Sequence, residues 1–181
     1  KVSETPQSTN CTDCEAGESS TSIGGAKCTS CGAGQYGDIK GVECKDCATG
    51  RYRVNDKDPD KNNPKICDTC PTGYYQKLEG QASCLPCLPG EFGNETGLHI
   101  CYKCESGRYR TSDMAAVFCE ACPAGFSQKN VGTATCFPCL PGEFGNEAGL
   151  LSCLKCSEGR YRATSDGDDE NRTVCDGCPK G

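Results

Sequence analysis

The apolar residues of this chain occur in short groups and never recur at the spacing of one helix face. Most groups follow a Cys-x-x-Cys pair and contain a glycine, an aromatic residue and a second glycine before the next pair. Short apolar stretches between glycines are typical of tight turns and extended segments. The pattern therefore predicts a series of short two-stranded β-ribbons with little other regular secondary structure.

The ribbon-forming segment, which we call a module, repeats with an even period. Ten Cys-x-x-Cys pairs begin 16 to 23 residues apart, and such a period indicates a repeat array. The stretch 84–110 recurs nearly unchanged at 136–162. The pairs begin at Cys11, Cys28, Cys44, Cys67, Cys84, Cys101, Cys119, Cys136, Cys153 and Cys175.

Three kinds of module alternate along the chain. The first contains Gly-x-x-Gln-Lys, as at 73–77, the second Gly-Glu-Phe-Gly-Asn-Glu, as at 90–95, and the third Gly-Arg-Tyr-Arg, as at 107–110. The extra residues of the longer modules fall in the third kind, whose loop we expect to tolerate insertions. The predicted organisation is a polar linker at 1–10, three-module cycles at 11–66, 67–118 and 119–174, and the truncated start of a fourth cycle at 175–181.

Composition argues against a conventional apolar core. Leu, Ile, Val and Phe make up 23 of 181 residues, about 13%, which is below the roughly 20% that folding by burial usually needs. The 20 cysteines, about 11% of the chain, exceed the ~8–10% that marks a disulfide scaffold. Closing a loop of about 15 residues stabilises a fold by about 3 kcal/mol. We therefore expect a small disulfide-rich fold, an elongated tandem array whose reduction leaves a disordered chain.

The cysteines and the charge also restrict the compartment and the partners. Disulfides in this number persist in the secretory pathway or outside the cell. A net charge of −6 disfavours nucleic acid and anionic membranes, because both bind basic faces. No run of 18 apolar residues occurs to span a bilayer, and no signal segment precedes Lys1. We expect an extracellular or cell-surface location and a piece excised from a longer chain.

Two disulfide schemes fit the repeat symmetry. In one, successive pairs interlock, as in Cys11 with Cys28 and Cys14 with Cys31. The other closes each loop on itself, treats all modules alike and is preferred, although it leaves Cys11 and Cys178 without partners. Its bridges are Cys14–Cys28, Cys31–Cys44, Cys47–Cys67, Cys70–Cys84, Cys87–Cys101, Cys104–Cys119, Cys122–Cys136, Cys139–Cys153 and Cys156–Cys175.

The segments CPTGYYQKLEGQASCLPC (70–87) and CPAGFSQKNVGTATCFPC (122–139) make the chain similar to a known family. Their Cys-Pro-x-Gly-aromatic start, mid-loop glycine and closing Cys-x-x-Cys resemble the ephrin-receptor-like cysteine-rich repeat, a relative of growth-factor-receptor and tumour-necrosis-factor-receptor-like modules. The resemblance covers residues 11–181 and implies a disulfide module of receptor ectodomains, large secreted proteins or surface proteins. The Gly-Arg-Tyr-Arg segments and the three-module cycle lie outside the general pattern and point to one long tandem protein.

Other chemistry is weaker in this sequence. Tandem Cys-x-x-Cys pairs also occur in zinc sites, but the glycine and aromatic pattern and the acidic balance favour disulfides. Redox catalysis would need one pair unlike the others. The single histidine, His99, is replaced by Leu151 in the other copy, and no catalytic motif occurs. We therefore expect neither an enzyme nor a cofactor or metal.

Two kinds of surface site are predicted in the loops. Asn-x-Thr sequons at Asn10, Asn94 and Asn171 are candidate N-glycan sites on exposed loops. Acidic inserts lie at 56–60 and 166–170. We interpret them as solvated loops, with weak Ca²⁺ binding as the alternative, because the first lacks the glycine and the closing glutamate of a calcium loop.

Basic and acidic segments alternate along the array. The simpler interpretation is that Arg51, Arg108 and Arg160 lie over neighbouring rings or carboxylates of their own chain. The alternative hypothesis is that parallel copies dock through them. The candidate interface consists of Arg108, Tyr109, Arg110, Arg160, Tyr161 and Arg162.

The sequence therefore predicts a thin rod of modules that each touch only their neighbours. Its expected function is structural or adhesive, as a repeat segment of a large extracellular, cell-surface or filament-forming glycoprotein. The expected partners are itself, other extracellular proteins and N-glycans. The alternative is a receptor ectodomain whose modules bind a protein ligand.

Overall fold

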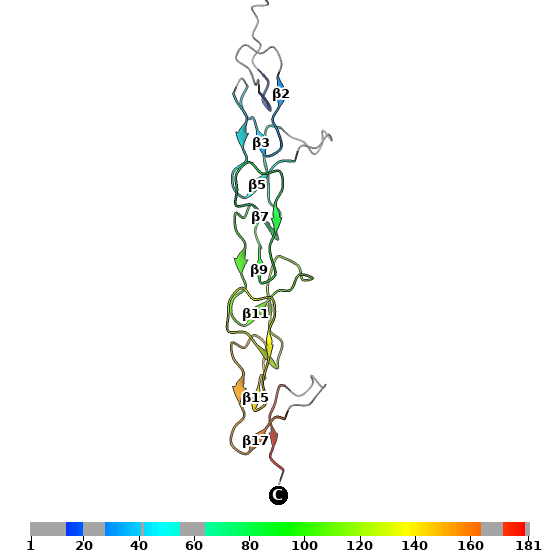
Figure 1. Cartoon of the computed structure of the whole chain (residues 1–181), viewed down its shortest axis with the longest axis vertical. Coiled ribbons are helices and arrows are strands. Elements are labelled where there is room, and N and C mark those ends of the chain that lie inside the picture. The colour runs from blue at the N-terminus through cyan, green and yellow to red at the C-terminus, as the bar shows by residue number, and fades with distance from the viewer. Residues whose placement is uncertain (1–13, 20–27, 41, 55–63, 164–171, 180–181) are drawn as a thin grey trace, which may run out of the picture. The chain divides into compact units, whose positions relative to one another are not determined.

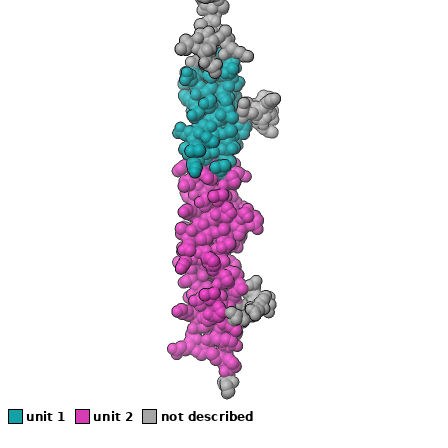
Figure 2. Space-filling model, in the orientation of Figure 1, with its two compact units in different colours: residues 1–70, 76–85 teal, residues 71–75, 86–181 magenta. Residues whose placement is uncertain are grey.

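The computed structural model describes residues 14–19, 28–40, 42–54, 64–163 and 172–179. The chain forms two compact units (Figure 2): residues 1–70 and 76–85 belong to unit 1, and residues 71–75 and 86–181 to unit 2. In the described part of the chain no helix is long and apolar enough to cross a membrane.

Regular secondary structure in the described residues consists of two-residue β-strands, as the glycine and aromatic pattern predicts. Within unit 2, β9, β11, β15 and β17 follow one another in chain order (Figure 1). The strands are β1 (Glu18–Ser19), β2 (Thr29–Ser30), β3 (Gln35–Tyr36), β4 (Lys45–Asp46), β5 (Arg51–Tyr52), β6 (Asp68–Thr69), β7 (Tyr74–Tyr75), β8 (Leu85–Pro86), β9 (Glu91–Phe92), β10 (Tyr102–Lys103), β11 (Arg108–Tyr109), β12 (Glu120–Ala121), β13 (Phe126–Ser127), β14 (Phe137–Pro138), β15 (Glu143–Phe144), β16 (Leu154–Lys155), β17 (Arg160–Tyr161) and β18 (Asp176–Gly177).

Successive strands form antiparallel hairpins. In unit 1, β1 pairs with β2, β3 with β4 and β5 with β6. In unit 2 the same pairing joins β9 to β10, β11 to β12, β13 to β14, β15 to β16 and β17 to β18. Each hairpin therefore belongs to one module, so other bonds must join the modules to one another.

A tight turn starts each hairpin, and the module of β9 and β10 illustrates it. The N–H of Glu91 donates to the carbonyl of Leu88 (2.9 Å), with Pro89 and Gly90 in between. Gly90 has φ +81°, which a type II turn requires at its third position, and proline suits the second. The N–H of Cys104 then donates to the carbonyl of Gly90 (2.8 Å) and closes the ribbon.

Among the described residues nine disulfides hold the hairpins, with Cα–Cα distances of 5.5 to 5.8 Å. They are the nine bridges of the loop-closing scheme, from Cys14–Cys28 to Cys156–Cys175. Apart from Leu98, the buried apolar side chains in the described residues are half-cystines. The predicted fold class, a small disulfide-rich tandem array of β-ribbon modules with little regular secondary structure, is confirmed.

Candidate functional site: the junctions between modules

Among the described residues, one residue in each module connects that module to its neighbours. It is the third residue after the turn glycine, and we call it the junction residue. In the module closed by Cys104–Cys119 it is Arg110, whose carbonyl accepts the N–H of Gly90 in the preceding module (2.8 Å). The N–H of Arg110 donates to Thr133 in the following module (3.4 Å). The junction residue therefore joins three consecutive modules.

The residue type at the junction distinguishes the three kinds of module, which we call Gln, Gly and Arg modules. The carbonyl bond is the same in all three: Gly93 accepts from Gly73 (2.7 Å) and Gln128 from Gly107 (2.6 Å). The described junction residues are Gln76 and Gln128, then Gly37, Gly93 and Gly145, then Arg53, Arg110 and Arg162.

In Gly modules the junction leaves little room for a side chain. A Cβ at Gly93 would lie 2.9 Å from Leu98 Cδ1 and 3.2 Å from Cys87 Sγ. At Gly145 it would lie 3.2 Å from Cys139 Sγ. The disulfide and the backbone of the preceding module occupy the space, so lack of room, not backbone conformation, selects glycine here.

In Gln modules the junction side chain ties its own loop together. The amide Nε2 of Gln128 donates to the carbonyl of Thr135 (2.8 Å), and its Oε1 accepts the N–H of Asn130 (3.0 Å). Gln76 makes the same bonds with Ser83 and Leu78. Gln128 is 1% exposed, and burial of an amide requires that its donors and acceptors be paired.

In Arg modules the junction side chain reaches back into the preceding Gly module. The Arg110 guanidinium donates from Nε to the carbonyl of Glu91, and from Nη2 to the carbonyls of Cys87 (2.7 Å) and Leu88 (2.6 Å). Its Nη1 donates to Thr111 and Met114 in its own loop, both at 3.2 Å. A guanidinium carries five N–H donors, so these five carbonyls match its capacity.

The other two Arg modules repeat this contact with the preceding turn. Arg53 donates to the carbonyls of Cys31, Gly32 and Gln35 in unit 1. Arg162 donates to the carbonyls of Cys139, Leu140 and Glu143 in unit 2. Arg110 and Arg53 are each 2% exposed, whereas Arg162 is half-buried.

The buried charge of Arg110 is surrounded by the dipoles of backbone carbonyls and makes no direct contact with a carboxylate. Burial lowers the pKa of this guanidinium, and the charge of Glu91 opposes that shift. Burial lowers the pKa of Arg53 in the same direction. Because arginine keeps its proton in proteins, both side chains are cations at physiological pH, and their hydrogen bonds are charge-assisted.

The guanidinium takes the place of a backbone donor used in the other modules. The carbonyls of Cys47, Cys104 and Cys122 accept the N–H of a glycine in the next module's loop, from Gly80 (2.8 Å), Gly132 (2.7 Å) and Gly149 (2.8 Å). The corresponding carbonyl in a Gly module, such as that of Cys87, accepts from the arginine. The Arg-module loop at 111–118 contains no glycine, so its backbone is released from this contact.

The structure separates the six predicted interface residues into two groups. Arg110 and Arg162 turn inward to the preceding module, and Arg110 offers no donor to a partner molecule. Arg108 and Arg160 are exposed on β11 and β17, and each donates from Nη1 to a backbone carbonyl, of Cys119 (2.9 Å) and Cys175 (3.2 Å) respectively. Tyr161 is exposed and Tyr109 is half-buried.

Sequence reasoning missed the inward role of the second arginine. A signal was present, because Gln, Gly and Arg recur at one position, three residues after the turn glycine, each in its own kind of module. Such a pattern indicates a position whose side chain makes a specific contact within its own or a neighbouring module.

The remaining predicted site residues lie as follows. Asn94 is exposed, while Asn10, Asn171 and the acidic inserts 56–60 and 166–170 lie outside the described residues. Cys178 is exposed and unpaired, and Cys11 also lies outside the described residues. Within the described ranges, no group of three or more His, Cys, Asp or Glu side chains is arranged to hold a metal ion.

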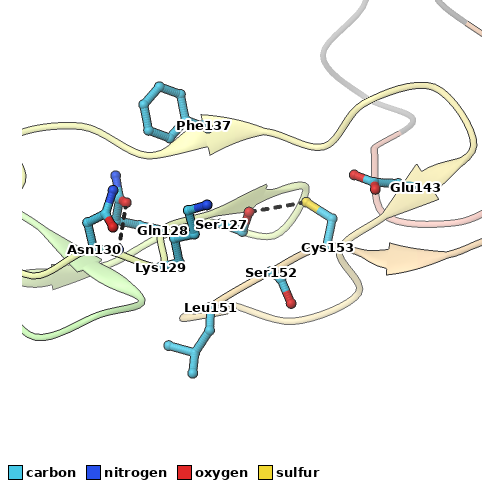
Figure 3. A pocket seen from close by; sticks show the side chains of 9 residues that line it. All are labelled: Ser127, Gln128, Lys129, Asn130, Phe137, Glu143, Leu151, Ser152 and Cys153. Atoms are coloured by element: carbon cyan, nitrogen blue, oxygen red, sulfur yellow. Dashed lines mark hydrogen bonds between the residues drawn. The ribbon is translucent and has the colours of Figure 1, made fainter.

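A shallow hollow in unit 2 lies between the Gln and Gly modules of the third cycle (Figure 3). Phe137 and Leu151 lie on opposite sides of it, and the hydroxyl of Ser127 donates to Cys153 Sγ at 3.4 Å. Cys153 is bridged to Cys139, so this sulfur is no thiolate nucleophile.

Hairpins closed by single disulfides and joined in tandem define a cysteine-rich repeat protein of the extracellular type. The family described as tyrosine-protein kinase ephrin type A/B receptor-like matches residues 61–97 and 90–134. Residues 61–134 are therefore similar to ephrin-receptor-like repeats, and this match includes the motif at 70–87 and part of the motif at 122–139.

One curated relative comes from Rattus norvegicus and is named sushi, von Willebrand factor type A, EGF and pentraxin domain-containing protein 1. It is 29% identical to this chain over 100 residues. The match covers 52% of this chain and 2% of the length of the rat protein.

Proposed function

We propose that this chain is a non-enzymatic structural segment that spaces other parts of a larger extracellular, cell-surface or appendage glycoprotein. The observation that carries the proposal is the junction itself. Backbone hydrogen bonds join successive modules, and the side chain at the junction is either absent, as in Gly93, or buried, as in Gln128 and Arg110. In such a chain the buried polar groups hold the modules together.

Contacts between non-adjacent modules support resistance to bending. A Cβ at Gly90 would lie 2.6 Å from the carbonyl carbon of Gly132, two modules further on. A Cβ at Gly107 would likewise lie 3.0 Å from the carbonyl carbon of Gly149, which is also two modules further on. In unit 2 a bend at one junction would therefore open contacts that span two junctions, and this raises its energetic cost.

Distance measurements between equivalent modules test the spacer function. Leu88 and Leu140 occupy equivalent turns in unit 2 and are 60% and 64% exposed. Spin labels attached there through bioorthogonal amino acids should give one narrow distance distribution, which broadens on reduction of the disulfides. A broad distribution in the oxidised chain would contradict the proposal.

Lateral self-association is the finer part of the proposed function. Exposed arginines recur on equivalent strands, Arg108 on β11 and Arg160 on β17, one cycle apart. Their spacing would let a second copy, or another extracellular protein, meet the same feature twice. The inward-facing Arg110 and Arg162 are left out of this interface.

A receptor ectodomain is the second candidate, and the receptor-like description of the matching family favours it. In that case one face of the modules would bind a protein ligand. Substitutions confined to one module would then abolish ligand binding without broadening the distance distribution between Leu88 and Leu140.

A further inference from the structure

The Gly modules expose a three-residue arch between two glycines. In the third cycle the N–H of Gly145 donates to the carbonyl of Arg172 (2.9 Å), and the N–H of Gly149 donates to that of Cys122 (2.8 Å). The arch at 146–148 between these anchors is fully exposed. In the second cycle Gly93 is anchored on Ala116 (2.8 Å), and the arch at 94–96 is likewise exposed.

The three arches share the backbone hydrogen bond of the glycine that precedes them but differ in side chains. They read Asp-Ile-Lys at 38–40, Asn-Glu-Thr at 94–96 and Asn-Glu-Ala at 146–148. The first carries surface ion pairs, Lys45 with Asp38 (3.0 Å) and Lys40 with Glu15 (2.8 Å). Only the second of these arches is an Asn-x-Thr sequon, and its three residues fill the arch between Gly93 and Gly97.

We propose that Asn94 is an N-glycan acceptor, and this rests on the proposed extracellular function because the modification occurs in the secretory pathway. The donor is an oligosaccharide linked to lipid pyrophosphate. The amide Nδ2 of Asn94 bonds to the anomeric carbon of the first sugar and loses one proton. The bond between that carbon and the phosphate oxygen breaks, and the lipid pyrophosphate leaves with the electron pair.

The arch tolerates a large substituent because the Gly93 anchor on its N-terminal side does not use its side chains. The Gly93 anchor is a backbone bond, and Leu98, the next buried residue, packs against Gly93 from beyond the arch. Asn94 and Thr96 are both exposed, so a glycan projects into solvent. The glycan would mark the second cycle, leaving the equivalent Asn146 bare.

The matched arch at 146–148 supplies the experiment. The 181-residue chain is secreted from a eukaryotic cell line as wild type, T96A, T96S and A148T, and glycopeptides and disulfides are mapped by mass spectrometry. Cleavage after Lys77 and Lys103, and after Lys129 and Lys155, places Asn94 and Asn146 on separate peptides. Peptide-level mapping also separates both from the sequons at Asn10 and Asn171.

We expect a glycan at Asn94 in wild type and T96S, its loss in T96A, and a second glycan at Asn146 in A148T. The wild type and the three variants should keep the same disulfides. An unmodified Asn94 in a chain with native disulfides overturns the proposal, whether or not A148T is modified at Asn146. Free thiols among the 18 cysteines of the nine bridges would instead overturn the proposed extracellular function, on which the glycan depends.

Discussion

The guanidinium Nη2 of Arg110 donates to the carbonyl of Cys87 at 2.7 Å, in the place where a loop glycine serves the equivalent carbonyl elsewhere. At the next junction the N–H of Gly132 donates to Cys104, also at 2.7 Å. One bond is made by a side chain and the other by the backbone. The Arg-module loop therefore donates no N–H to this carbonyl, although the carbonyl of Ala116 in that loop still accepts the N–H of Gly93 (2.8 Å).

Replacing Arg110 by alanine should loosen the junction on its N-terminal side. The change leaves five buried or half-buried carbonyls without their charged donor, and we expect a loss of about 3 to 5 kcal/mol in local stability. Amide hydrogen exchange at Gly90, which donates to the carbonyl of residue 110, should rise by about 100-fold or more. R110K should restore part of the protection, because an ammonium has three donors and lacks the planar fork.

Arg162 is the matched control for Arg110. It makes the equivalent bonds to Cys139, Leu140 and Glu143 but is half-buried, so water can reach the carbonyls after its removal. R162A should therefore raise exchange at Gly142 less than R110A raises it at Gly90. Equal effects would show that burial of the cation does not set the strength of the junction.

Replacing Gly90 by alanine should destabilise its module more than the same change at Gly142. Both glycines have positive φ, +81° and +76°, so both substitutions strain the backbone by about 1 to 3 kcal/mol. A Cβ at Gly90 also meets the carbonyl group of Gly132, whereas nothing lies within 4 Å of one at Gly142. This overlap should add about 1 to 3 kcal/mol.

The N–H groups of Cys104 and Cys156, which donate to Gly90 and Gly142 respectively, at 2.8 Å each, report the two effects by hydrogen exchange. If both amides lose the same protection, contact between non-adjacent modules contributes nothing to stability. That result would also weaken the argument that these contacts resist bending.

Replacing Gln128 by glutamate should make stability depend on pH. The carboxylate can still accept from Asn130 but faces the carbonyl of Thr135 in a buried site, so its folded pKa should be raised above the unfolded value of about 4.3. The protonated acid can donate to Thr135. The variant should therefore be most stable below about pH 4.3 and lose stability as pH rises through the folded pKa.

Lys129→Glu supplies the control for Gln128→Glu, because it places a carboxylate on the exposed neighbouring residue. Thermal unfolding of the two variants and the wild type between pH 3 and pH 8 would compare them. A parallel pH profile for both variants would show that the amide of Gln128 is not needed as a buried donor.

Reversing the charge of Arg108 and Arg160 should reduce self-association if copies dock through these strands. Each arginine also donates to a backbone carbonyl of its own module, so R108E and R160E must first be shown to keep the wild-type disulfides. Sedimentation velocity at low and moderate salt then measures the effect. Unchanged association of the double variant would remove the exposed arginines from the proposed interface.

Much of the fold could be predicted from composition and spacing. The scarcity of apolar residues and the even Cys-x-x-Cys period predicted disulfide-closed ribbons, and the structure has buried half-cystines where other proteins have an apolar core. The junction chemistry could not be predicted, since Arg110 and Cys87 are 23 residues apart and no local pattern says that they meet. The composition of Gly-Arg-Tyr-Arg suggested a surface, yet its last residue is buried in Arg53 and Arg110 and half-buried in Arg162.

The sequence by itself determined which residues form a module. Turn glycines, cysteine spacing and the lack of other apolar side chains leave a short chain few ways to fold, because each hairpin is built from neighbours along the chain. Only the tertiary structure decided how modules connect. Backbone carbonyls have no identity in the sequence, and the five that surround Arg110 converge only after two modules have folded and stacked. Because of this stacking, Arg110 is a buried cation, whereas Arg108, two residues earlier, is an exposed one.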